Sequence, residues 1–306
     1  MSNIDLSVNL GGIRMKNPVT VASGTFGYGR EYADLVDITR LGAVTVKGIR
    51  NCVWKGNALP RHVEVTGGMV NAIGLQGPGV EGFAEKYMPF LCEKNVPVIV
   101  NIWGTSIDEY CEVARKLSDV KGVSGLELNI SCPNVKEGGN AFGTDPRTVA
   151  RLVSAVRAST KLPLMPKLAP NVPDIRVFVR AAQDSGADAV ALINTIPAMV
   201  IDIESRRPVL SNKVGGLSGP AVHPVAVKLV WDAHSVASVP LLAMGGIVSA
   251  DQAVEFMIAG AAAVAVGTAN FIDPSTFVKV IAGIERYMLG HGFSSSEELT
   301  GSIITD

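Results

Sequence analysis

Short hydrophobic runs recur along the chain, and stretches with helical periodicity separate most of them. Eight of these runs are apolar on both faces, which is typical of strands in a parallel sheet that is covered on both sides. The runs occupy residues 19–22, 43–47, 98–101, 125–129, 164–167, 189–193, 241–243 and 263–266. The pattern therefore predicts eight buried parallel strands.

The amphipathic segments between the runs predict helices. They cover residues 31–37, 106–117, 146–159, 173–185, 222–237, 250–258 and 274–288. Several begin with a capping residue followed by proline, as in Asp145-Pro146 and Asp273-Pro274. About eight such units in a chain of 306 residues is the count of a (β/α)8 TIM barrel. An α/β barrel is the prediction, and a doubly wound sheet is the alternative.

Four additions to the barrel are expected, a hairpin and three insertions. An N-terminal hairpin is predicted over residues 6–15, with its turn at Gly11-Gly12. Long insertions follow the second and sixth runs, at residues 49–97 and 195–220, and a shorter one follows Cys132. Because each insertion follows a strand, all three are expected on the C-terminal face, as lids or walls of a site. Residues 1–306 are expected to form a single domain.

Composition excludes several classes of function. The formal net charge is −1 and there is no basic run, which argues against nucleic-acid or membrane-surface binding. The first ten residues lack a secretory signal, and the longest apolar stretch, 257–266, is far shorter than a membrane span. These features predict a cytoplasmic protein. The four cysteines form no CxxC motif, so neither a metal site nor an iron–sulfur cluster is expected on this chain.

The residues at the predicted strand tips cover only part of the chemistry that active sites use. They comprise lysines, amides, hydroxyls, glycines and one thiol, but no His, Asp or Glu, which argues against a metal-dependent or paired-carboxylate hydrolase. Two lysines without a carboxylate beside them indicate a negatively charged ligand. The tip residues are Ser23, Gly24, Lys47, Gly48, Asn101, Asn129, Cys132, Lys167, Asn194, Thr195, Gly245, Gly246, Gly267 and Thr268.

Two kinds of ligand group are indicated by these tips. Gly245-Gly246 and Gly267-Thr268 follow the seventh and eighth runs, where barrel loops commonly bind phosphate through backbone N–H groups. The glycine-rich residues 215–220 can reach over the same ligand. Asn71, Asn129, Asn134 and Asn194 offer both donors and acceptors, which match the alternating edge of a pyrimidine or imide ring.

Cys132 follows the fourth run in Ser131-Cys132-Pro133-Asn134, where the proline forces a turn. A lone cysteine in a turn is most often a packed apolar residue. Among these tips, however, only a thiol titrates near neutrality, at about pH 8.5 against roughly 10.4 for lysine. Glu127 shares a strand face with Asn129, one layer deeper, and as a buried carboxylate it needs a partner, which Lys47 or Lys167 can supply.

Together, five segments of the chain resemble the dihydroorotate dehydrogenase family. The resemblance covers nearly the whole chain in the same order. It implies an FMN-containing (β/α)8 barrel that oxidises dihydroorotate to orotate in de novo pyrimidine biosynthesis. The segments are residues 126–139 (LELNISCPNVKEGG), Asn71-Ala72-Ile73-Gly74-Leu75-Gln76, Thr45-Val46-Lys47-Gly48, Ile193-Asn194-Thr195 and Ala243-Met244-Gly245-Gly246-Ile247.

The subtype follows from three further features. Cys132 resembles the soluble class 1 enzymes, and residues 136–139 with 142–146 resemble their NAD-linked B type. That type implies a partner subunit carrying FAD and a [2Fe–2S] cluster, in a heterotetramer of two of each, which passes electrons to NAD. A fumarate-linked class 1 enzyme is the alternative. The chain departs from the family pattern at Gly77, where asparagine is expected, so no side-chain contact is assumed from that position.

The resemblance also assigns roles to individual residues, with Cys132 as the catalytic base that takes a proton from the substrate. The residues implied for FMN are Ser23, Lys47, Gly48, Asn101, Asn129, Lys167, Ile193, Gly219, Gly245, Gly246, Gly267 and Thr268. Those implied for substrate are Lys47, Asn71, Ala72, Ile73, Gly74, Leu75, Asn129, Asn134, Asn194 and Thr195.

Two other functions are consistent with the same residues. One is a related flavin-dependent pyrimidine oxidoreductase, including one that acts on a uracil base in RNA, although the lack of a basic patch disfavours RNA. The other is a non-catalytic phosphate- or nucleotide-binding barrel. A colourless purified protein would favour that second alternative.

Overall fold

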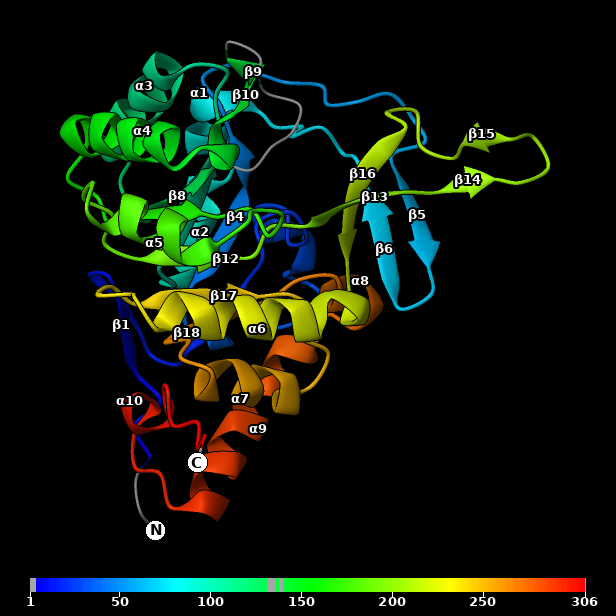
Figure 1. Cartoon of the computed structure of the whole chain (residues 1–306). Coiled ribbons are helices and arrows are strands. Elements are labelled where there is room, and N and C mark those ends of the chain that lie inside the picture. The colour runs from blue at the N-terminus through cyan, green and yellow to red at the C-terminus, as the bar shows by residue number, and fades with distance from the viewer. Residues whose placement is uncertain (1–3, 131–135, 138–139, 306) are drawn as a thin grey trace.

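The computed structural model describes residues 4–130, 136–137 and 140–305, and its core is a barrel of eight parallel strands surrounded by helices (Figure 1). From β4 to β18 each barrel strand pairs with the next barrel strand in the chain, and β18 pairs with β3, as expected for a (β/α)8 barrel. All eight predicted runs form strands, so the barrel prediction is confirmed and the doubly wound alternative is wrong. The strands are β3 (Val19–Val21), β4 (Val44–Ile49), β7 (Val98–Ile102), β8 (Val123–Asn129), β11 (Leu164–Lys167), β12 (Val190–Leu192), β17 (Leu241–Met244) and β18 (Ala263–Val266).

The first and second strands meet at the seam that closes the barrel. Gly42 N–H donates to the Val19 carbonyl at 2.9 Å, and Thr20 Oγ1 donates to the Ala43 carbonyl at 2.8 Å. A Cβ atom on residue 42 would lie 2.0 Å from the Asn17 carbonyl oxygen. Glycine is therefore required for the two strands to come this close.

Six of the seven predicted helices form around the barrel. The predicted N-cap of α4 is present, because the Asp145 side chain accepts a hydrogen bond from Arg147 N–H. Two shorter helices, α8 (Ala269–Ile272) and α10 (Ser296–Leu299), complete the C-terminal part. The six helices are α3 (Ile107–Ser118), α4 (Pro146–Ser159), α5 (Ile175–Gln183), α6 (His223–His234), α7 (Ala250–Ile258) and α9 (Thr276–His291).

The helix predicted over residues 31–37 is wrong. The chain forms two short 3₁₀ turns there, η1 (Arg30–Tyr32) and η2 (Ile38–Arg40). The side chain of Asp37 accepts from Thr39 N–H and thereby starts the second turn instead of continuing the first. The predicted stretch was also too short for helical periodicity to stabilise it without packing.

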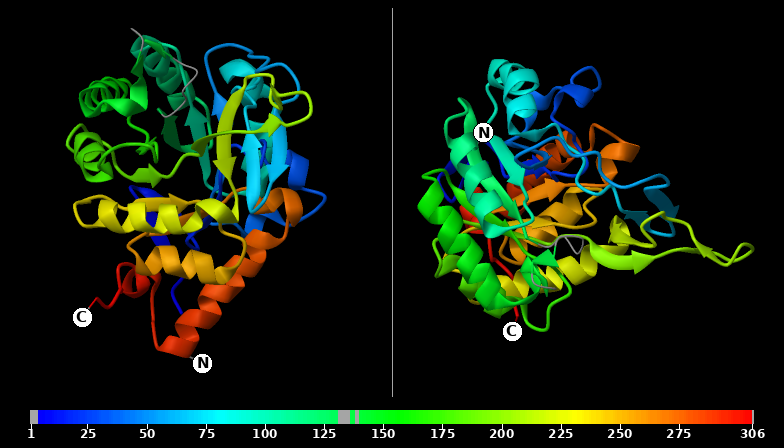
Figure 2. Two further views of the ribbon diagram at one scale, coloured as in Figure 1. Left: turned by 45° about the vertical axis from the view of Figure 1, so that its right-hand side comes forward. Right: turned by 90° about the horizontal axis from the view of Figure 1, so that it is seen from above.

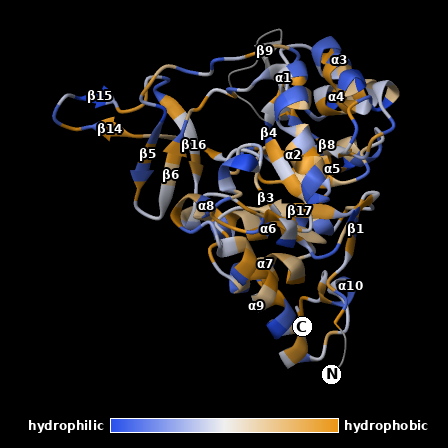
Figure 3. Ribbon diagram, turned by 180° about the vertical axis from the view of Figure 1, so that it is seen from behind, coloured by the Kyte–Doolittle hydropathy of each residue, from blue (hydrophilic) through white to orange (hydrophobic). Residues whose placement is uncertain are grey.

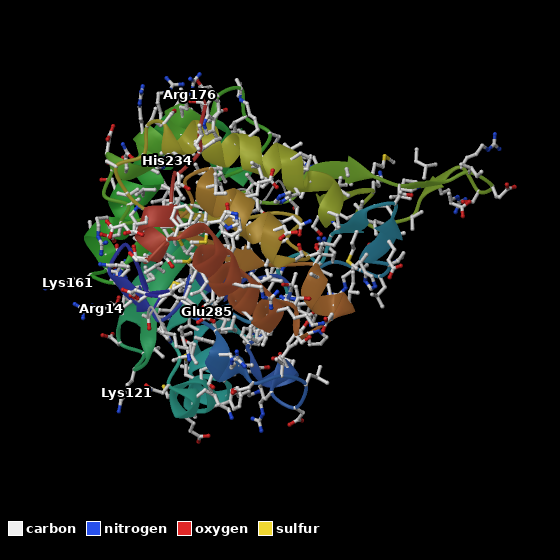
Figure 4. The ribbon with its side chains drawn as sticks, turned by 90° about the horizontal axis from the view of Figure 1, so that it is seen from below. Arg14, Lys121, Lys161, Arg176, His234 and Glu285 are labelled. Atoms are coloured by element: carbon white, nitrogen blue, oxygen red, sulfur yellow. The ribbon has the colours of Figure 1, made fainter. Side chains whose placement is uncertain are left out.

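The amino end of the barrel is closed by the predicted hairpin, which consists of β1 (Val8–Leu10) and β2 (Ile13–Met15). Its apolar side chains are buried with the alanines and the larger residues Ile99 and Met165 of the lower barrel interior. Seen from below, Arg14, Lys121 and Lys161 lie at this end of the molecule (Figure 4). The lower barrel is thus a packed apolar core, which leaves the carboxyl end for a site.

The two long insertions pair with each other over the carboxyl end (Figure 2). Strands β5 (His62–Val65) and β6 (Gly68–Asn71) come from the first, and β13 (Ile196–Met199) and β16 (Val214–Ser218) from the second. They form one antiparallel sheet in the order β13-β16-β6-β5, here called the cap sheet. The predicted position of the insertions is confirmed, whereas their pairing was not predicted.

Several smaller elements complete the insertions and loops. The first insertion also contains α1 (Gly79–Lys86) and α2 (Met88–Lys94). A small hairpin, β14 (Ile201–Asp202) with β15 (Arg207–Pro208), projects beyond the cap sheet, and β14 is hydrophobic in Figure 3. Short strands β9 (Lys136–Glu137) and β10 (Asn140–Ala141) pair after β8, followed by the turn η3 (Phe142–Thr144), and η4 (Pro220–Val222) leads into α6. In the ranges that the structure covers, no helix is long and apolar enough to cross a bilayer.

Candidate active site

A cavity of about 910 Å³ lies between the barrel strand tips and the cap sheet. Every predicted site residue within the described ranges lines it. Cys132 and Asn134 lie outside the described residues. The predicted residues that line the cavity are Ser23, Lys47, Gly48, Asn71, Ala72, Ile73, Gly74, Leu75, Asn101, Asn129, Lys167, Ile193, Asn194, Thr195, Gly219, Gly245, Gly246, Gly267 and Thr268.

A buried polar cluster forms the floor of this cavity. Glu127 is fully buried; its Oε1 accepts from Asn101 Nδ2 at 2.5 Å and lies 3.9 Å from Lys167 Nζ. The predicted partner of Glu127 is therefore Lys167. Among the described residues, Glu127 Oε2 and Asn101 Oδ1 have no hydrogen-bond partner. Unpaired buried oxygens are costly, so the cluster is suited to receive donors from a bound ligand.

Lys47 reaches the cavity from the tip of β4. Burial is the main cause that lowers the pKa of Lys47, Arg61 lowers it further, and Glu31 opposes both. Within the described ranges, no carboxylate forms an ion pair with the Lys47 ammonium. A partly buried ammonium without such a partner favours an anionic ligand.

Two asparagines and a threonine are connected on the next wall. Asn194 Nδ2 donates to Asn129 Oδ1 at 3.1 Å, while Asn194 Oδ1 accepts from Thr195 N–H at 2.9 Å. The Asn129 carbonyl accepts from Tyr110 Oη at 2.7 Å, which anchors the end of β8. These contacts use only part of each amide. The remaining donors and acceptors of these amides can bind a ring whose edge carries carbonyl and N–H groups, such as an imide.

The cap sheet forms the roof and approaches the ligand space closely. Asn71 Nδ2 donates to the Gly216 carbonyl at 3.4 Å. A Cβ atom on Gly216 would lie 1.9 Å from Thr195 Oγ1. Any side chain at position 216 would therefore displace Thr195. Glycine at this position lets the backbone of the cap sheet lie close to Thr195, a predicted substrate residue.

Glycine turns after β17 and β18 form the far end of the cavity. Gly245 and Gly246 both have positive φ, 139° and 74°, which favours glycine. Among the described residues, the backbone N–H groups of Gly246 and Thr268 have no acceptor. Thr268 Oγ1 donates to Ser218 Oγ at 2.7 Å, which ties this turn to the cap sheet. Donors without acceptors around glycine turns are suited to an anion such as phosphate.

The departure at Gly77 has a structural reason. Gly77 and Trp54 exchange two backbone hydrogen bonds, of 2.9 and 3.0 Å. A Cβ atom on residue 77 would lie 2.8 Å from the Gly48 carbonyl oxygen. In this chain the backbone at position 77 thus lies close to the backbone of Gly48, and a side chain at position 77 would require one of the two segments to shift.

An arginine clamp attaches the loop before the cap sheet to the barrel. The Arg50 guanidinium lies 4.8 Å from the Trp54 ring centre and 4.7 Å from that of Trp103, and it pairs with Glu109 at 2.6 Å. Trp54 Nε1 in turn donates to the Gly74 carbonyl at 3.0 Å. Gly74 belongs to the predicted substrate segment, so the clamp holds that segment in place.

Some cavity residues were not predicted from the sequence. They include His62, Asn171, Asn212 and Phe271. Asn171 follows the fifth strand and could have been found by extending the tip beyond Lys167. His62 and Asn212 belong to the two insertions, whose position over the cavity depends on a sheet that spans distant segments. No local pattern indicates such a pairing.

This fold and site define a class of protein. A (β/α)8 barrel carries a large cavity at its carboxyl end, with glycine turns suited to an anion on one side and amides with an ammonium on the other. Such an arrangement is that of a barrel enzyme.

The comparisons with known proteins identify the family. The family model described as dihydroorotate dehydrogenase matches residues 5–288. A protein of Geotalea uraniireducens is 50% identical over 305 residues, which is 100% of both chains. One of Alkaliphilus metalliredigens is 52% identical over 303 residues, covering 99% of this chain and 100% of the relative. Both relatives are named dihydroorotate dehydrogenase B (NAD(+)), catalytic subunit. The chain belongs to the dihydroorotate dehydrogenase family.

Proposed function

We propose that this chain is the catalytic subunit of an NAD-linked dihydroorotate dehydrogenase, which oxidises dihydroorotate to orotate in pyrimidine biosynthesis. The names of relatives that match over their full length support this function. The observation that carries it is a single cavity that combines glycine-turn donors with the amides of Asn71, Asn129 and Asn194. A cofactor phosphate and a pyrimidine ring need these two sets of groups together.

FMN fits the barrel side of the cavity. The volume of about 910 Å³ is sufficient for a flavin nucleotide and a small substrate together. The N–H groups of Gly246 and Thr268 are available to the phosphate, and Gly267 allows it to approach. Asn101 and Lys167 can bind the polar edge of the ring. When bound, FMN supplies the acceptor for the hydride that the substrate loses.

The remaining residues proposed for FMN surround the same space. Four of them offer backbone groups or an apolar contact, and three offer side-chain donors. They are Gly48, Gly219, Gly245 and Ile193, with Ser23, Lys47 and Asn129.

Substrate is proposed to bind beneath the cap sheet. The Lys47 ammonium pairs with the substrate carboxylate, which compensates for the partial burial of this charge. Asn129, Asn194 and Thr195 hold the ring edge, and the segment of Asn71, Ala72, Ile73, Gly74 and Leu75 covers the ring from the roof. Asn134 is proposed for the same ring on the sequence resemblance alone.

Cys132 is proposed as the base that accepts the C5 proton of dihydroorotate. This role rests on the sequence, because only a thiol among the tip residues titrates near neutrality. Replacement Cys132→Ala should preserve FMN binding and slow reduction of the bound flavin by about 10²- to 10⁴-fold, the usual contribution of a general base. Cys132→Ser should recover rate only at high pH. A wild-type rate in Cys132→Ala would exclude the role.

The partner completes the proposal. We infer a second subunit that carries FAD and a [2Fe–2S] cluster, in a heterotetramer of two of each, because the relatives are named catalytic subunits of an NAD-linked enzyme. The test is co-expression of the chain with the candidate subunit. Dihydroorotate should reduce NAD only when both are present. Reduction of fumarate by the isolated chain would favour the fumarate-linked alternative.

Two features of organisation belong to the same proposal. We propose that the whole chain acts as one domain, since both insertions build one sheet on the barrel mouth. We also propose a cytoplasmic location. The three cysteines within the described ranges are free thiols, their usual state in a reducing compartment.

A further inference from the structure

A buried histidine stands directly behind the glycine turn that follows β17. His223 begins α6, is 8% exposed, and packs edge-on against Phe256 with ring centres 4.8 Å apart. Its Nδ1 lies 2.9 Å from the Gly245 carbonyl oxygen, and its Nε2 lies 2.8 Å from Glu255 Oε2. Neither His223 nor Glu255 was singled out from the sequence for any role in the site.

The direction of the hydrogen bonds follows from the partners. A carbonyl oxygen only accepts, so His223 Nδ1 must carry a proton and donate it to Gly245. With Nδ1 protonated, the short contact at Nε2 needs a proton between the ring and the Glu255 carboxylate, whichever of the two carries it. Glu255 therefore fixes the orientation of the ring, and the ring fixes the Gly245 carbonyl.

The same carbonyl belongs to the peptide unit that contains Gly246 N–H. In a planar trans peptide the C=O and N–H groups point in opposite directions. Holding the carbonyl against His223 therefore directs Gly246 N–H away from α6 and into the cavity, where it has no acceptor among the described residues. A flip of this peptide would present a carbonyl oxygen to an anion instead.

Because the peptide joins two glycines, it can flip at a low cost in energy unless another group holds it in place. Gly245 and Gly246 carry no side chain to restrict rotation, and both have positive φ. The packing is tight on the histidine side, since a Cβ atom on Gly246 would lie 2.7 Å from His223 Cβ. The hydrogen bond from His223 therefore holds the Gly245–Gly246 peptide in one orientation.

We propose that His223, oriented by Glu255, is a positioning residue that holds the Gly245–Gly246 peptide with its N–H directed at the cofactor phosphate. His223 does not touch the cofactor and acts only through this peptide. The inference rests on the proposed function, which assigns the phosphate of FMN to the turns after β17 and β18.

The test compares FMN with riboflavin, which has the same ring but no phosphate. The full-length chain is stripped of flavin, and both ligands are titrated by flavin fluorescence. In the His223→Phe variant, the Kd for FMN should rise about 5- to 10-fold, the value of one hydrogen bond. The Kd for riboflavin should stay within about twofold. His223→Asn, which retains a donor near the position of Nδ1, should restore most of the FMN affinity.

A second variant covers the case in which His223→Phe does not fold. Glu255 has a side chain that is 55% exposed, so Glu255→Gln should fold and weaken FMN binding about two- to threefold, again without an effect on riboflavin. His291→Asn and Glu285→Gln are the matched controls, since both residues are exposed on α9 (Figure 4 labels Glu285) and should leave both affinities unchanged.

Three results would count against the assignments, and they are distinguishable. If His223→Phe keeps the wild-type FMN affinity, the proposed positioning role of His223 is wrong. If it weakens FMN and riboflavin by the same factor, the histidine is merely structural and the inference is also wrong. If the wild-type chain binds riboflavin as tightly as FMN, the phosphate site of the proposed function fails instead.

Discussion

The floor and the roof of the cavity are built in different ways. The floor residues Asn101, Glu127 and Lys167 lie on central barrel strands, are at most 6% exposed, and contact one another. The roof is the cap sheet, whose own small core contains Val70, Ala72 and Leu210. Floor side chains are fixed by hydrogen-bonded strands on both sides, whereas the roof joins the rest through loops.

This difference indicates that the floor binds the cofactor and the roof binds the substrate. A rigid, charged floor suits a cofactor that stays bound through many turnovers. A roof that is attached by loops suits a substrate that must enter and leave, as in enzymes whose loops cover the active site. Changes in the floor should therefore affect folding and FMN binding, and changes in the roof should affect substrate binding while FMN stays bound.

The largest effect is expected in the floor, for Glu127→Gln. This change removes the carboxylate from beside Lys167 and replaces one acceptor of Asn101 with a weaker one. Breaking a buried ion pair costs about 3 kcal/mol, so the free energy of unfolding should fall by that amount and the purified protein should lose FMN. Urea denaturation and the visible spectrum measure both. A loss below about 1 kcal/mol with full FMN content would show that the floor does not depend on this pair.

The roof should respond in the opposite way in Gly216→Ala. The added methyl group would meet Thr195 Oγ1 and displace a proposed substrate residue. Small displacements in an active site can cost up to about 100-fold, so the KM for dihydroorotate should rise at least about 10-fold, while FMN affinity stays within about twofold. Gly290→Ala is the matched control, because no atom lies within 4 Å of the position of its added Cβ. An equal loss of FMN would mean that floor and roof are not separable.

Lys47 lines the cavity between floor and roof, and its charge predicts a pH dependence. Burial lowers its pKa below the ordinary 10.5, so in the folded protein the ammonium is lost at a lower pH than in the unfolded chain. This group therefore costs stability at low pH, and that cost disappears as the pH rises toward 10.5. The affinity for anionic orotate depends on the charged ammonium, so it should fall as the pH rises, whereas the stability should increase.

Orotate affinity should consequently fall by about 10-fold, the value of a hydrogen bond to a charged group, as the pH rises through the lowered pKa of Lys47. Arginine stays charged in this range, so Lys47→Arg should flatten the profile even if it binds orotate less well. Titration of orotate against the wild-type chain and this variant checks the effect. The same pH profile in both would assign the titration to another group.

The smallest effect is expected where the roof is attached. Trp54→Phe keeps an aromatic ring near Arg50 but removes the N–H that binds the Gly74 carbonyl. One such hydrogen bond is worth about 1 kcal/mol, or roughly fivefold in affinity. The KM for dihydroorotate should rise by about that factor without loss of FMN. An unchanged KM would show that the clamp does not position the substrate segment.

The same contrast explains how much could be predicted from the sequence. The floor was predictable because strand periodicity is local and the tips of parallel strands converge in a barrel. Lys47, Asn129 and Gly245 could therefore be placed in one site from their spacing alone. The partner of Glu127 was narrowed to two lysines by strand parity, and only the geometry selects Lys167.

The roof and the positioning groups could not be predicted in the same way. The cap sheet pairs β6 with β16, more than a hundred residues apart, and their glycine-rich sequences have no strand periodicity. The sequence placed His223 only within the predicted helix over residues 222–237, because its contact with Gly245 depends on how α6 packs behind β17. Cys132 and Asn134 remain predictions from the sequence.

The most direct measurement of the central claim uses the isolated chain without any partner subunit. The purified protein should contain FMN, and dihydroorotate added without oxygen should bleach the visible flavin absorbance, with orotate formed in equal amount. NAD alone should not restore the colour. A protein that contains no flavin, or a bound flavin that dihydroorotate leaves oxidised, would contradict the claim that this cavity holds both cofactor and substrate.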